Sequence, residues 1–78
     1  MVLIVDFDSF KEYIKECRII FYRVLENEIR INAGKVATVI QFRDENEKQR
    51  ILAWLESLKE TKIVVHVKDV VRDESFFI

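Results

Sequence analysis

The sequence predicts a single α+β domain with the element order β-α-β-β-α-β. Two stretches carry apolar residues at helical spacing, residues 9–26 and the segment that follows Asp44. Four shorter stretches alternate apolar with polar residues or are rich in β-branched ones, which indicates strands. Half of the 78 residues are apolar and 35% are charged, a composition typical of a folded domain.

Length and charge limit the possible functions. A domain of 78 residues is too small to enclose a large catalytic cavity in one protomer. The net charge of −1 argues against a dedicated nucleic-acid binder, and Cys17 alone cannot form an internal disulfide. With no signal peptide and no membrane span in the sequence, we expect a cytoplasmic protein. Many charges and few Gln and Asn suggest a thermophilic source.

The first half of the chain is predicted as a strand followed by a long helix. The apolar run 2–5 indicates a buried central strand. Ser9 and Glu12 have the spacing of a capping box, so a helix over residues 9–26 is expected to begin there. An alternative makes residues 18–25 a strand, because RIIFYRVL is rich in β-forming residues.

The second half is predicted as a hairpin, a helix and a last strand. Strands over 28–32 and 35–42 flank a turn in which Gly34 can adopt positive φ. Asp44 and Glu47 predict the start of a second helix, which should end by Thr61. Residues 62–68 alternate as a last strand, and residues 69–78 are expected to form an extra strand or a docking tail.

This element order is that of the ferredoxin-like fold. It predicts a four-stranded antiparallel sheet of strand order 4-1-3-2, with both helices on one face. The opposite face would then carry apolar side chains that need a cover, which is a second copy, another protein or the tail. The interface residues expected there are Ala37, Val39, Val64, His66, Phe76 and Phe77.

Asp6 and Asp8 end the first predicted strand, where paired carboxylates can hold a divalent cation. The string VDFDSF around them resembles the first acidic motif of lesion-bypass DNA polymerases and the opening motif of haloacid-dehalogenase-like phosphatases. Either resemblance implies metal-dependent phosphoryl-transfer or nuclease activity with Mg²⁺ or Mn²⁺, with further acids lent by a partner protomer. The sequence favours a plainer role, in which both carboxylates stabilise the start of the next helix.

The predicted topology is also similar to that of the RNA-recognition motif, which stacks bases on aromatic residues of its sheet. In the strand 35–42 those positions are occupied by Ala37 and Val39, so RNA binding is expected to be weak at most. His66 and Cys17 are expected to be ordinary packed or solvated residues.

The function expected from the sequence is therefore a non-enzymatic interaction or regulatory module that forms a homodimer through its open sheet face. No catalytic residue and no cofactor is predicted. The metal-dependent enzyme centred on Asp6 and Asp8 and the weak RNA binder are the alternatives.

Overall fold

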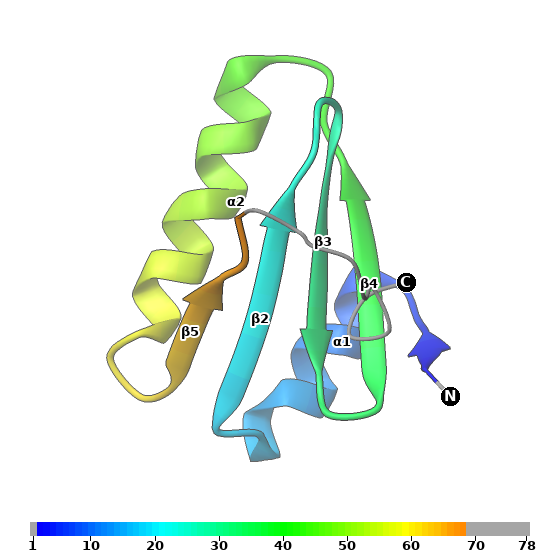
Figure 1. The fold of residues 1–78 in the computed structure, drawn as a ribbon, viewed down its shortest axis with the longest axis vertical. Coiled ribbons are helices and arrows are strands. Elements are labelled where there is room, and N and C mark those ends of the chain that lie inside the picture. The colour runs from blue at the N-terminus through cyan, green and yellow to red at the C-terminus, as the bar shows by residue number, and fades with distance from the viewer. Residues whose placement is uncertain (1, 69–78) are drawn as a thin grey trace.

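The computed structural model describes residues 2–68, which form two helices and a mixed five-stranded sheet (Figure 1). Its elements are, in chain order, β1 (Leu3–Ile4), α1 (Phe7–Tyr13), the 3₁₀ turn η1 (Ile14–Glu16), β2 (Ile19–Val24), β3 (Glu28–Ala33), β4 (Val36–Gln41), α2 (Glu45–Leu58) and β5 (Ile63–His66). The strand order across the sheet is β1-β4-β3-β2-β5.

The α+β class is confirmed, but the predicted four-stranded antiparallel sheet is wrong. The sheet has five strands, and only β2–β3 and β3–β4 pair antiparallel. β1 lies parallel to β4 and β5 lies parallel to β2. The additional strand is β2, which comes from the second half of the predicted long helix.

The helix predicted over residues 9–26 is wrong, and the alternative strand over residues 18–25 is confirmed as β2. The α-helix ends at Tyr13, one 3₁₀ turn follows, and Cys17 adopts extended dihedrals of φ −100° and ψ 147°. The physical reason is that this β-branched and aromatic segment pairs on both sides, with β3 and with β5. A helix in this segment would lose the hydrogen bonds to both neighbouring strands.

The predicted central position of the first strand is also wrong. Among the described strands β1 lies at the edge and pairs with β4 alone, and its side chains are largely exposed, at 62% for Leu3 and 56% for Ile4. The helix that follows begins earlier than expected. Its N-cap is Asp6, whose Oδ1 accepts a hydrogen bond from the backbone N–H of Ser9 at 2.7 Å.

The hairpin and the second helix are confirmed. Gly34 has φ 62°, and a Cβ at this position would lie 2.9 Å from the hydroxyl of Tyr13, so the turn requires glycine. Asp44 caps α2, because its Oδ1 accepts from the backbone N–H of Glu47 at 2.9 Å. The Glu47 carboxylate in turn accepts from the backbone N–H of Arg43 at 2.8 Å.

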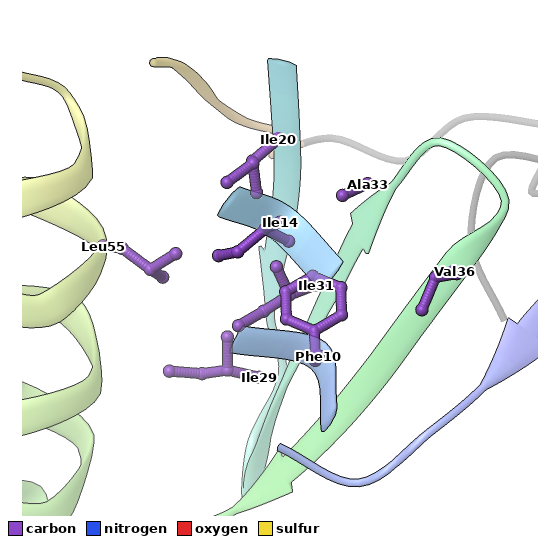
Figure 2. Close-up of a cluster of buried hydrophobic side chains, with 8 residues drawn as sticks. All are labelled: Phe10, Ile14, Ile20, Ile29, Ile31, Ala33, Val36 and Leu55. Atoms are coloured by element: carbon purple, nitrogen blue, oxygen red, sulfur yellow. The ribbon is translucent and has the colours of Figure 1, made fainter. Parts of the chain in front are cut away.

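Both helices pack on the same side of the sheet. In Figure 1 α1 lies behind β3 and β4. Figure 2 shows that side chains from α1, η1 and α2 converge on inward-facing side chains of the sheet. The cluster consists of Phe10, Ile14, Ile20, Ile29, Ile31, Ala33, Val36 and Leu55, all of them buried. Complete burial stabilises a large apolar side chain by about 1.5–3 kcal/mol, so this cluster dominates the stability of the fold.

Candidate interaction surface

The alternation of side chains along the strands gives the sheet a helix-covered face and a helix-free face. Ile29 and Ile31 of β3 belong to the buried cluster, whereas Arg30 between them points to the other side. In β4 the partly buried Ile40 packs against the cluster, so Val39 faces away from the helices. Within residues 2–68 no helix covers this second face of the sheet, which we call the helix-free face.

One row of side chains crosses all five strands of the helix-free face. The paired positions run from Ile4 to Ala37, then to Asn32, Phe21 and Val65, each residue being the register partner of the next. Four of the five are apolar, and the only polar one stands on the central strand. We call this set the central row.

A second row, next to the central row, is polar in its middle. Arg30 of β3 lies directly opposite Arg23 of β2 on one side and Val39 of β4 on the other. The Arg30 Nε–H donates to Oε2 of Glu28 at 2.6 Å, and both side chains of this ion pair are partly buried. Two arginines in cross-strand positions repel each other, so carboxylates are favourable neighbours here.

An exposed apolar pair lies on the other side of the central row, away from the two arginines. Ile19 of β2 and Ile63 of β5 are register partners, and they are 45% and 58% exposed. Beside them is a shallow hollow, wide open to solvent, of about 370 Å³. It is lined by Cys17, Arg18, Ile19, Phe21 and Gly34. An apolar hollow next to exposed isoleucines can accept an apolar side chain from another molecule.

Two of the six predicted interface positions lie on the face that the sequence suggested. Ala37 and Val39 lie on the helix-free face, as expected. Val64 packs against the helix-side cluster, and His66 follows it on the same side, so the expected orientation of these two residues is wrong. Phe76 and Phe77 lie outside the described residues.

The orientation of β5 was missed because residues 63–67 are apolar on both sides of the strand, except for His66. Pairing with β2 determines which side of β5 faces the helices, since Val64 lies beside the buried Ile20. Sequence reasoning therefore missed Ile63 and Val65, and also Ile19 and Phe21 of the unexpected strand β2. The β-branched and aromatic content of IIFYRV is the signal that could have revealed the last two.

His66 stacks on Tyr22, with the ring centroids 4.5 Å apart and the ring planes 9° from parallel. The pKa of His66 is lowered from its ordinary value, first by partial burial and then by the positive charges of Lys68 and Lys59. The neutral imidazole is therefore the form that the fold favours, although His66 itself is exposed at the end of β5 on the helix-covered side.

The structure assigns Asp6 and Asp8 to the start of α1. The Asp6 carboxylate is held by the Ser9 backbone N–H, and its pKa is lowered by this hydrogen bond and then by a second one from the Ser9 hydroxyl. The Asp8 side chain is 93% exposed and its Oδ1 lies 3.5 Å from Nζ of Lys11. Within residues 2–68 no group of three or more His, Cys, Asp or Glu side chains is arranged to hold a metal ion.

Comparisons with known proteins found no match: no protein-family model, no curated protein and no solved structure matches the chain. In the part of the chain that the structure describes, no helix is long and apolar enough to cross a membrane.

Proposed function

We propose that this protein is a small interaction module whose binding surface is the helix-free face of its sheet, and that it acts by self-association in the cytoplasm. The observation that carries the proposal is the exposure of Ile4, Ile19 and Ile63 on that face. Isolated exposed apolar residues are ordinary, but three large ones around a single sheet face are typical of a protein-binding surface.

A second copy of the chain fits this surface well. A two-fold interface brings the same face of each protomer together, so the apolar rows of both copies cover each other. The net charge of −1 gives little long-range repulsion between two copies. The hollow beside Ile19 and Phe21 offers a recess for an isoleucine of the partner protomer.

Light scattering of the full chain, at two concentrations about a hundredfold apart, tests self-association. The mass should rise from that of a monomer towards that of a dimer. Ile63→Asp should abolish this increase in mass, because it places a charge next to Ile19 in the proposed interface. Ala53→Asp, on the exposed surface of α2, is the matched control and should associate as the parent does. A single monomeric mass at both concentrations would contradict the proposal.

A further inference from the structure

Two hollows adjoin each other at the end of the sheet where β2 and β5 begin (Figure 1). One is the apolar hollow of about 370 Å³ beside Ile19 and Ile63. The other, of about 670 Å³, is formed by the 3₁₀ turn η1, the start of β2 and the turn that precedes β5. Its lining residues are Lys15, Glu16, Cys17, Arg18, Thr61 and Lys62. Because Cys17 and Arg18 line both, the hollows share one wall, and we call them the paired hollows.

The larger of the paired hollows is basic. Three of its six lining residues carry a positive charge and one carries a negative charge. Nζ of Lys62 donates to the backbone carbonyl of Cys17 at 2.6 Å, which fixes the ammonium group and offsets the carbonyl end of η1. Lys15 already pairs with Glu12 at 3.1 Å. The guanidinium of Arg18 is exposed and forms no ion pair within residues 2–68, so it is available to an incoming anion.

The side chains of the larger hollow also determine what kind of anion fits. The ammonium and guanidinium groups are hydrogen-bond donors only, the Thr61 hydroxyl can donate as well, and Glu16 is the one pure acceptor. A carboxylate only accepts hydrogen bonds, so it matches this set. An extended peptide also brings backbone N–H groups, which need acceptors that the hollow scarcely offers. A small anion is therefore the better occupant.

The smaller hollow suits hydrocarbon. Arg18 is its only charged lining residue, and the exposed register pair of Ile19 and Ile63 stands beside it. A hydrocarbon chain laid over this pair removes apolar surface from water on both molecules. Since Arg18 lines both hollows, it stands where a charged head and an apolar tail of one molecule would meet.

We propose that the paired hollows bind an anionic amphiphile, a free single-chain carboxylate. Its head lies at Arg18 and Lys62, and its hydrocarbon tail covers Ile19 and Ile63. Both hollows are shallow and open to solvent, so the complex is weak and exchanges rapidly. The inference goes beyond the proposed function but shares the two isoleucines with the proposed interface, so the amphiphile and a second protomer compete for them.

Methyl NMR of the full chain, at a low protein concentration, follows the binding of octanoate as a probe. We expect saturable shifts for the methyl groups of Ile19 and Ile63 and constant shifts for Ile29 and Ile31 in the core. Octanol has the same tail without the charge. It should bind at least about tenfold more weakly, because it lacks the charge-assisted hydrogen bonds of the carboxylate. Equal affinity for both probes, or no saturable shift with octanoate, would overturn the proposal.

Charge variants test the position of the head. Arg18→Glu should weaken octanoate binding at least about tenfold, whereas Arg18→Lys keeps the charge and should retain most of the affinity. Arg50→Glu makes the same charge change on the exposed surface of α2 and is the matched control, which should bind as the parent does. Circular dichroism verifies that each variant is folded, and Arg18→Ala serves as a milder second variant. Equal affinities of Arg18→Glu and Arg50→Glu would overturn the proposal.

Light scattering with and without octanoate separates this inference from the proposed function. Octanoate should lower the mass measured at the higher protein concentration, because it occupies the surface that a second protomer needs. Saturable octanoate shifts in a chain that stays monomeric support the amphiphile site and overturn self-association. Dimerisation without octanoate shifts supports self-association and overturns the amphiphile site. Binding to phosphatidylglycerol vesicles without binding of octanoate would also overturn a site for a free carboxylate.

Discussion

The two faces of the sheet are made by the same strands but differ in what stabilises them. On the helix-covered face, Ile29 and Ile31 are completely buried beneath helices of the same chain. On the helix-free face the intervening positions hold Arg30 and Asn32, and exposed isoleucines stand around them. One face is a permanent core, whereas the other combines apolar area with polar groups that tolerate water. Such a mixed surface is suited to reversible binding.

The largest difference in stability between the two faces should appear when apolar side chains are shortened. Ile31→Ala should lower the free energy of unfolding by about 2–5 kcal/mol, because it leaves a cavity in a fully buried cluster. Val39→Ala, on the next strand but facing away from the helices, should cost less than half as much. Urea denaturation of both variants gives the comparison. Equal losses would mean that the two faces are packed alike.

A smaller effect is expected from the turn that sets the register between β3 and β4. Gly34→Ala should cost roughly 1–2 kcal/mol, because an L-residue is disfavoured at φ 62° and the new Cβ would crowd the Tyr13 hydroxyl. Thermal unfolding measures the loss. Lys35→Ala, at the next position of the same turn, is the control and should be close to neutral. A neutral Gly34→Ala would show that the turn does not depend on this dihedral angle.

The ion pair on the helix-free face should contribute less to the free energy of unfolding than the Gly34 turn does. Glu28→Gln removes the carboxylate that pairs with Arg30 and leaves this guanidinium opposite Arg23. The expected loss is about 1 kcal/mol in low salt, and it should shrink in high salt because screening weakens the repulsion between the arginines. Unfolding at two ionic strengths checks both statements. A loss that does not depend on salt would point to a packing role of Glu28.

The smallest expected effect is a change in stability with pH, caused by His66 on the helix-covered face. Because the pKa of His66 is lowered in the folded chain, the unfolded chain binds the proton more readily. His66 should therefore leave stability unaffected well above its ordinary pKa of 6.5 and should reduce it as the pH falls below that value. The melting temperature of the parent should drop more than that of His66→Gln between pH 7.5 and pH 5. Parallel curves would show that the stacked imidazole does not couple to folding.

The sequence predicted those parts of the fold that local chemistry determines. The turn at Gly34 needs a residue that tolerates positive φ, and the start of α2 needs the Asp44 side chain as a cap. Ile29 and Ile31 alternate with charged residues, so the buried side of β3 was evident. Because Ala37 and Val39 pair with the polar positions that alternate with these isoleucines, their orientation away from the helices was also predicted correctly.

Pairing between distant segments determined what the sequence could not predict. In residues 18–25 the apolar positions satisfy a helical and a strand period, and only the partners β3 and β5 decide between them. The apolar run that contains β1 is typical of a buried strand, yet within residues 2–68 β1 pairs with β4 only. In β5 both sides are apolar, so the position of Ile20 across the ladder determines that Val64 faces inward.

The central claim is that the helix-free face is the binding surface, and methyl NMR of the full chain tests it most directly. Spectra are recorded over a hundredfold range of protein concentration. We predict concentration-dependent shifts for the methyl groups of Ile19 and Ile63, and constant shifts for Ile29 and Ile31 in the core. Shifts that are confined to Leu3, or to the exposed side of α2, would contradict the claim. Spectra that do not change with concentration would contradict self-association itself.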